Sequence, residues 1–348
     1  MKRIFSLTLT LLLTASLLFG CSSEPAPTTE AADTTAAPET TAETVPETAA
    51  PTQSPEEAEV LKIIVIGNSH SNDAFWLLQY AFQDQMPEQK LILGAIYYSG
   101  CSIDQHIQFT TERQNVYAYH KNENGKWKTQ EDVPIETGLC DEAWDVIIFQ
   151  AGSSDTADKT LNKDGRDTLA QIVRERVSQP YTMVWHSSWP SPNDPTFFSP
   201  TYEVQPPSGT QQRLQERYGH DPFVQFEHMV TVVKDNILND DTYELAISTG
   251  AGVMYAHATL GVPQLDLWRD YTHLSDYGRL IAAYCLYAQF TGNTVETINL
   301  DLIPADDRVR RARSKGDLIV TEEMKQVIIA SANHSLEDPW TVPAKPAN

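Results

Sequence analysis

A serine and a distant aspartate–histidine pair are the residues of this chain best suited to chemistry. Ser69 follows the apolar run Leu61–Ile66 within the sequence Gly-Asn-Ser, and Asp270 precedes His273 by three residues near the far end of the chain. A serine hydroxyl becomes a strong nucleophile when an imidazole accepts its proton, and that imidazole needs an acceptor on its other nitrogen. The three side chains therefore predict acyl transfer, with Ser69 as nucleophile, His273 as base and Asp270 as its partner.

The residues around Ser69 predict where this serine lies in the fold. The run before it is rich in β-branched residues and indicates a buried parallel strand, while the segment from Asp73 onward has the pattern of an amphipathic helix. The turn between them lies at the carboxyl end of the strand, where open α/β sheets bind their ligands. We expect His70, directly after the serine, to have a capping or surface role. Without a base nearby, the turn would be purely structural.

Four blocks of sequence, in order along the chain, resemble the SGNH (GDSL-like) hydrolases. The two central blocks, Gly-Cys-Ser-x-x-x-His and Trp-Asp-Val-Ile-x-x-Gln, are similar to a poorly characterised SGNH-like family of bacterial surface proteins. The resemblance covers roughly residues 60–340 and implies a flavodoxin-like fold with a Ser-His-Asp triad. The blocks are Gly67-Asn68-Ser69, Tyr98–His106, Trp144–Ser154 and Asp270–His273.

The resemblance also implies an oxyanion hole, the set of donors that stabilises negative charge on the carbonyl oxygen of the substrate. The expected backbone donors are the N–H groups of Ser69 and Gly100. The usual third block, Gly-x-Asn-Asp, supplies an asparagine amide, but the corresponding Gly152–Asp155 contains no asparagine. The Gln150 amide is the expected replacement, and the Ser154 hydroxyl is the alternative. Losing one such donor typically lowers turnover by about 10²–10³.

Three further side chains near the predicted strand ends are candidate substrate contacts: His186, Asn68 and Trp185. His186 could instead be a core histidine, or the base in place of His273, and Asn68 could simply support its turn. His106 matches the second block, so we expect it to make a local structural hydrogen bond.

The first residues of the chain have the pattern of a bacterial lipoprotein signal. Two basic residues and a short apolar run occupy residues 1–20, and Leu18-Phe19-Gly20-Cys21 fits a lipobox. Cys21 is therefore the expected lipidation site, which would carry palmitate or a similar acyl chain. Residues 21–58 are almost wholly Thr, Ala, Pro, Glu and Ser and are expected to form a disordered tether. These features predict a lipoprotein on the outer face of a bacterial cell membrane, with the Cys21 lipid as its only membrane contact.

The remainder is expected to form one SGNH hydrolase-like domain, 59–340, followed by a tail, 341–348. Strands alternate with helical segments, which predicts an α/β fold: a three-layer α/β/α sandwich around a central, mostly parallel five-stranded sheet. The Pro-rich stretch 189–221 is too long for an idle connection and is expected to border the substrate cleft. The predicted strands cover about 61–66, 91–98, 144–150, 182–188 and 243–248, and the principal helices about 73–84, 164–178, 222–237, 275–290 and 321–333.

Composition restricts the partners of the chain. A formal net charge of −22 opposes nucleic-acid binding. No Cys/His spacing typical of zinc and no acidic calcium loop occurs, so we expect neither a metal nor a cofactor. Cys101 and Cys140 could form a disulfide outside the cytoplasm, whereas Cys285 lies in an apolar helical segment and is expected to be a core thiol.

Two classes of function agree with these observations. One is a serine esterase, expected to be monomeric, that hydrolyses acyl esters, chiefly acetyl esters, of a small molecule or glycan. The other is a surface binding lipoprotein that keeps the fold with little turnover. The presence of all three triad residues favours the esterase.

Overall fold

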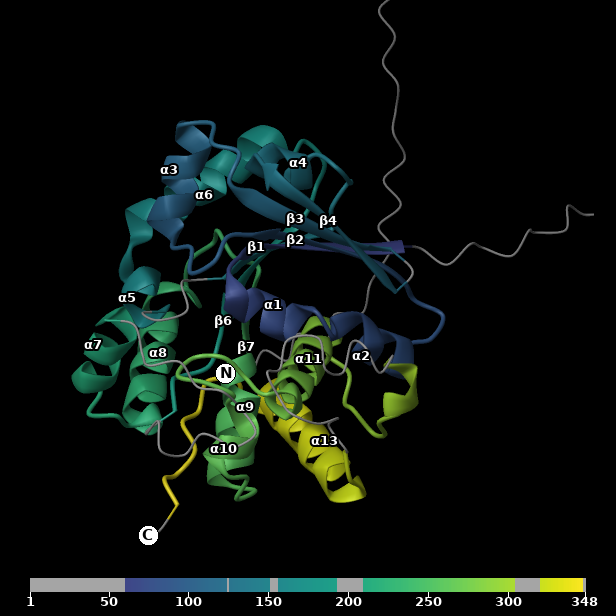
Figure 1. Ribbon diagram of the computed structural model, residues 1–348, viewed down its shortest axis with the longest axis vertical. Helices are drawn as coiled ribbons and strands as arrows, with labels where there is room; N and C mark the ends of the chain where they lie inside the picture. The colour runs from purple at the N-terminus through teal and green to yellow at the C-terminus, as the bar shows by residue number, and fades with distance from the viewer. Residues whose placement is uncertain (1–59, 124, 151–155, 193–208, 304–319, 347–348) are drawn as a thin grey trace, which may run out of the picture. The chain divides into compact units, whose positions relative to one another are not determined.

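The computed structural model divides the chain into two units, Met1–Glu57 and Ala58–Asn348, and every described element belongs to the second (Figure 1). The predicted signal peptide, Cys21, the tether and Ser154 lie outside the described residues. The described residues are 60–123, 125–150, 156–192, 209–303 and 320–346.

A seven-stranded sheet forms the centre of this unit, in the order β4-β3-β2-β1-β5-β6-β7. Five of its strands are parallel and correspond to the five that the sequence predicts. They are β1 (Val60–Gly67), β2 (Lys90–Tyr97), β5 (Val146–Gln150), β6 (Thr182–Ser187) and β7 (Leu245–Ser248).

The predicted count of five strands is wrong because a hairpin extends the sheet beyond β2. Its first strand, β3 (Tyr117–Glu123), pairs antiparallel with β2, and its second strand, β4 (Lys126–Val133), pairs antiparallel with β3 at the edge of the sheet. The outermost strand reads Lys-Trp-Lys-Thr-Gln-Glu-Asp-Val and is exposed along most of its length. An edge strand of this kind has neither the apolar run nor the alternation by which strands are recognised in a sequence.

Helices cover both faces of the sheet, which confirms the three-layer α/β/α architecture (Figure 1). Alternate residues of β1 face opposite sides, so Ile63 and Val65 belong to one hydrophobic core while Ile64 and Ile66 belong to the other. The first core is shared with α1 (Ser69–Phe75), α2 (Leu78–Gln85), α9 (Thr249–Ala258), α10 (Gln264–Leu267), α11 (Asp276–Thr291) and α13 (Glu322–Glu337).

The second core lies under α3 (Ile103–Thr111), α4 (Ile135–Leu139) and α6 (Lys163–Arg176). Helix α8 (Pro222–Asn236) contributes residues to both cores, and α5 (Thr156–Leu161) packs on it. The remaining helix, α7 (Gly209–Arg217), and a 3₁₀ turn (Leu300–Leu302) complete the described elements.

The cysteines of this unit are not bonded to one another. Cys101 and Cys285 are buried free thiols, and Cys140 is an exposed free thiol. The conceivable Cys101–Cys140 disulfide is therefore not formed, whereas the prediction of a core thiol at Cys285 is confirmed. Among the described helices, none has both the length and the apolar composition needed to cross a membrane.

Candidate active site

The register of the sheet brings three of the four sequence blocks to one edge. Gly67 at the end of β1 pairs with Tyr97 at the end of β2, and Ile66 pairs with Phe149 of β5. Each of these parallel strands therefore ends at the same level. The turn that contains Ser69, the loop that contains Gly100 and the Gln150 side chain all follow directly from this alignment.

Ser69 is the first residue of α1 and is partly exposed. The residue before it caps the helix: the Asn68 side-chain oxygen accepts from the His70 N–H at 3.0 Å. The Asn68 amide donates to the Cys101 carbonyl at 3.0 Å, which ties the turn to the loop after Gly100. Asn68 is completely buried and shapes the turn, which is one of the two roles that the sequence analysis left open for it.

A serine that the sequence analysis did not single out holds the candidate oxyanion donor. The Ser71 hydroxyl donates to Gln150 Oε1 at 3.0 Å and accepts from the Asn68 N–H at 3.2 Å. A Cβ atom at Gly67 would lie 1.9 Å from Ser71 Oγ and 3.0 Å from Gln150 Oε1. Only glycine therefore allows Ser71 and Gln150 to meet beneath the turn, and this hydrogen bond fixes the orientation of the Gln150 amide.

The second backbone donor predicted from the sequence lies in a left-handed turn. Gly100 has a φ of +64°, and no atom lies within 4 Å of where its Cβ would be. A residue with a side chain would be strained in this conformation, which explains the glycine in the second block. Ser102 then caps α3 by accepting from the Gln105 N–H.

Asp270 and His273 form the predicted carboxylate–imidazole pair. His273 Nδ1 lies 2.8 Å from Asp270 Oδ2 and 3.1 Å from Oδ1. Asp270 Oδ1 also accepts from the backbone N–H groups of Thr272 and His273, at 2.9 and 2.8 Å. Burial alone would raise the pKa of Asp270, but its hydrogen bonds and the charges of His273 and Arg269 hold that pKa below its ordinary value. The carboxylate therefore stays ionised beside the imidazole.

His70 brings the Ser69 turn against this loop, and its expected capping or surface role is wrong. It is buried, its Nδ1 bonds to the Ser188 hydroxyl at 3.1 Å, and its Nε2 bonds to the Thr272 hydroxyl at 2.8 Å. The ring stacks on Trp189, with 4.6 Å between the ring centroids.

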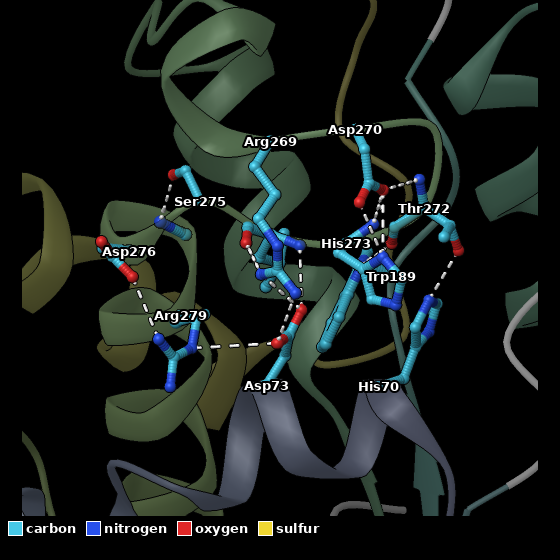
Figure 2. Close-up of polar contacts among 12 residues, drawn as sticks. His70, Asp73, Trp189, Arg269, Asp270, Thr272, His273, Ser275, Asp276 and Arg279 are labelled. Atoms are coloured by element: carbon cyan, nitrogen blue, oxygen red, sulfur yellow. Dashed lines mark hydrogen bonds and ion pairs between the residues drawn. The ribbon is translucent and has the colours of Figure 1, made fainter. Parts of the chain in front are cut away.

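Trp189 in turn donates to the Thr272 carbonyl at 2.8 Å (Figure 2). The first residues of the stretch 189–221 thus lie at the candidate site, while 193–208 lie outside the described residues.

Ser69 and His273 are brought into one region without a bond between them. Among the described residues, the Ser69 hydroxyl makes no hydrogen bond to His273, although the neighbouring residues of the two segments are in contact. Hydrogen bonds of this kind often tighten only when the substrate binds.

A network of buried ions connects α1 to the same loop (Figure 2). Asp73 forms a bidentate pair with Arg269, at 3.0 and 3.1 Å, and accepts from the Leu274 N–H at 3.2 Å. Arg279 of α11 lies 3.8 Å from Asp73 and 3.0 Å from Asp276. Burial would raise the pKa of Asp73, but Arg269, His273 and Arg279 lower it below its ordinary value.

The two remaining candidate contacts are placed under the sheet ends and not at an open surface. His186 is 2 % exposed, and its Nε2 bonds to the Thr249 hydroxyl at 2.9 Å. Trp185 is fully buried and packs edge to face on Tyr243. Both belong to β6, a parallel strand covered on both faces, and their contact with substrate stays a prediction. Of the two histidines, His273 is bonded to a carboxylate, whereas His186 is bonded to the Thr249 hydroxyl.

The expected structural role of His106 is confirmed. It is buried, and its Nδ1 bonds to the Tyr117 hydroxyl at 3.0 Å. In the part of the chain that the structure describes, no group of three or more His, Cys, Asp or Glu side chains is placed to hold a metal ion.

Part of the chain matches a known protein family, and its fold is similar to that of a solved member of this family. Residues 62–200 match the family model described as "Domain of unknown function (DUF4886)". A crystal structure of a DUF4886 family protein from Bacteroides uniformis ATCC 8492 has a TM-score of 0.63 at 22 % sequence identity, covering 82 % of this chain and 97 % of that one. The curated proteins contain no match to the chain.

Weaker likenesses extend to proteins described as hydrolases. An acetyl xylan esterase from Geobacillus stearothermophilus has a TM-score of 0.40 at 12 % identity, covering 70 % of this chain and all of that one. A proposed SGNH hydrolase from Slackia heliotrinireducens has a TM-score of 0.36 at 13 % identity, covering 67 % of this chain and all of that one. Scores this low carry no argument about activity. Residues 62–200 of the chain match the DUF4886 family model, and its α/β/α fold is similar to that of the solved DUF4886 family protein.

Proposed function

We propose that the protein is a serine esterase that hydrolyses acyl esters, with acetyl esters of carbohydrate as the first substrates to test. The observation that carries the proposal is the Asp270–His273 pair, held against the helix that begins with Ser69. An ionised carboxylate on one imidazole nitrogen and a partly exposed serine in the adjacent segment are the parts that nucleophilic acyl transfer requires.

The first half of the reaction follows from these positions. Asp270 accepts from His273 Nδ1, which leaves Nε2 as the nitrogen that takes a proton. His273 removes the proton of the Ser69 hydroxyl as Oγ attacks the ester carbonyl. The tetrahedral intermediate then collapses, the proton passes from His273 to the departing alcohol, and Ser69 is left acylated.

The second half repeats these steps with water in place of the serine. His273 takes a proton from the water molecule as the water oxygen attacks the acyl carbon. His273 then returns this proton to Ser69 Oγ when the carboxylic acid leaves. In both halves the negative charge on the carbonyl oxygen needs donors, and the Ser69 and Gly100 N–H groups with the Gln150 amide are the proposed set. The buried bond from Ser71 to Gln150 supports this assignment because it fixes the third donor before the substrate arrives.

The proposed setting of the enzyme is the outer face of a bacterial membrane, with Cys21 as its lipid anchor. One acyl chain binds membranes only marginally, so stable anchoring would need the several chains of a bacterial lipoprotein. Replacing Cys21 with Ser is expected to move the protein from the membrane fraction to the soluble fraction. Unchanged fractionation would contradict the anchor.

Steady-state kinetics on short p-nitrophenyl acyl esters and acetylated sugars test the proposed activity. We expect hydrolysis that disappears in Ser69→Ala, with acetyl and other short acyl groups preferred. The matched control is Ser102→Ala, which removes a serine at a nearby helix start that has no proposed chemical role. Failure of the wild-type protein to hydrolyse any ester, together with binding of intact sugars, would favour the surface binding lipoprotein instead.

A further inference from the structure

We propose that Asp73 and Arg269 are positioning residues that hold the proposed base, His273, against the helix of the proposed nucleophile. The inference rests on the proposed function, and it gives a task to a buried ion pair that the reaction itself does not use. Asp73 lies four residues after Ser69 on α1, so the two are separated by about one helical turn.

The base loop, residues 269–275, is organised locally and is attached to α1 by two side chains: His70, which bonds to the Thr272 hydroxyl, and Asp73. Within the loop, Asp270 binds the backbone and side chain of His273, and the Arg269 N–H donates to the His273 carbonyl at 3.0 Å. These contacts shape the loop but do not place it relative to Ser69. That placement needs contacts from α1. His70 supplies one to Thr272 inside the loop, and the two oxygens of Asp73 supply those on either side of the Asp270–His273 pair.

Each Asp73 oxygen has a partner on the segment that contains the base. Oδ1 accepts from Arg269 Nη2 at 3.1 Å, and Oδ2 accepts from Arg269 Nη1 at 3.0 Å and from the Leu274 N–H at 3.2 Å. Arg269 Nη1 also donates to the Leu274 carbonyl. The residues on both sides of the Asp270–His273 pair are thus fixed to one side chain of α1 (Figure 2).

The burial of the Asp73–Arg269 pair indicates that its role is to place the His273 segment relative to α1. The side chains of Asp73 and Arg269 are 1 % and 12 % exposed. A buried ion pair is weak evidence for stability, because desolvation of the two charges offsets much of their attraction. Its bidentate geometry instead fixes both distance and direction between the two segments, which a packed apolar contact would leave less defined. Arg279, which is fully buried and pairs with Asp276, joins α11 to the same carboxylate.

Arg269→Lys and Asp73→Asn test the inference, with Asp240→Asn as the matched control. The lysine keeps the charge of residue 269 but cannot make the bidentate contact. Asp240 pairs with Arg166 of α6 at 3.4 Å, away from the candidate site. The Arg166 side chain is 1 % exposed, so this ion pair is also buried. All three substitutions weaken a buried ion pair, so a loss that arises only from lower stability would appear in the control as well.

We expect Arg269→Lys and Asp73→Asn to lower kcat by about 10²-fold with little change in KM, because a misplacement of about 1 Å can cost that much. Asp240→Asn should leave kcat within about twofold. In a His273→Ala background, adding Arg269→Lys should have almost no further effect on the residual rate, since the pair acts only through His273. A persistent loss in that background, or equal losses in Arg269→Lys and Asp240→Asn, would overturn the inference.

Hydrogen exchange separates this inference from the proposed function. In both site variants, the segment 269–275 should exchange faster than in the wild-type protein, while the exchange of β1 and α6 stays unchanged. This measurement does not depend on turnover. A wild-type protein without esterase activity would defeat the proposed function, whereas unchanged exchange of 269–275 in the variants would defeat the positioning role. If Asp73→Asn fails to fold, the charge-conserving Arg269→Lys still decides the question.

Discussion

The imidazole rings of His70 and His273 lie edge to face, with 5.9 Å between their centroids. One ring follows Ser69 directly, and the other is the proposed base. Burial, followed by repulsion from His273, lowers the pKa of His70 to about 3. His70 therefore stays neutral near pH 7, so it adds no positive charge that would oppose an imidazolium at His273 in the proposed reaction.

Buried neutral histidines predict a loss of stability in mild acid. The pKa values of His70, His106 and His186 all fall to about 3 in the folded protein, because burial disfavours their charged form. Between the ordinary pKa of 6.5 and about 3, the unfolded chain binds protons that the folded chain does not. The free energy of unfolding should therefore fall as the pH drops through this window, by up to about 1.4 kcal/mol per pH unit for each histidine.

Urea denaturation at a series of pH values measures this slope. His186→Gln should make the slope shallower by about one proton, because glutamine does not titrate, while above pH 8 the wild-type and variant curves should both be flat with respect to these groups. A free energy of unfolding that stays constant from pH 7 to pH 4.5 would contradict the prediction.

The proposed triad should behave as one unit. Ser69→Ala and His273→Ala are each expected to remove most of the turnover, and the double variant should be barely slower than either, because both residues serve a single proton transfer. The loss of turnover in Asp270→Asn should be comparable to these or smaller, since Asp270 orients and stabilises the imidazole. Additive losses in kcat across the single and double variants would show that the residues act independently.

Gly67 should be required for activity beyond its contribution to stability. Gly67→Ala would force Ser71 away from Gln150, because the new Cβ would lie 1.9 Å from Ser71 Oγ. We expect a loss of about 10²-fold in kcat as the oxyanion donor moves. Gly138→Ala is the control: its Cβ would lie 2.6 Å from Ile96 in the core under α4, so it should lower stability without a specific effect on kcat. Parallel losses in the two variants would argue against a role for this contact.

Gln150 should be the third oxyanion donor. Gln150→Ala is expected to lower kcat by about 10²–10³ with a smaller change in KM, because the donor is most valuable when the carbonyl oxygen carries charge. Ser71→Ala should have a milder effect in the same direction, since it frees the amide without removing it. Full activity of Gln150→Ala would contradict this assignment and favour the Ser154 hydroxyl as the third donor.

The elements that could be predicted from the sequence are those whose burial is visible in it. The five parallel strands are short apolar runs, and the helix Asp276–Thr291 is apolar along most of its length, so both could be located. The hairpin Tyr117–Val133 could not, because its outer strand is polar and exposed. The apolar helix Thr249–Ala258 was also missed; it contains two glycines, which lower the expectation of a helix.

The contacts of the candidate site also divide into those that the sequence predicts and those that it does not. The Asp270–His273 pair is local, three residues apart in one loop, so its spacing is readable in the sequence. Asp73 and Arg269 are 196 residues apart, and neither belongs to a recognisable motif. Their pairing depends on how α1 and α11 pack on the sheet. Asn68, Trp185 and His186 lie close to the strand ends, but their side chains are buried, and the sequence alone does not show their burial.

Covalent labelling with a fluorophosphonate probe tests the central claim most directly, because only an activated serine reacts at an appreciable rate. Mass spectrometry of the digested wild-type protein should find the label on Ser69 at close to one equivalent per chain. Labelling should be lost in Ser69→Ala and strongly slowed in His273→Ala, while Asp240→Asn labels like the wild-type protein. No labelling of the wild-type protein, or labelling of Ser69 at an unchanged rate in His273→Ala, would contradict the proposed triad.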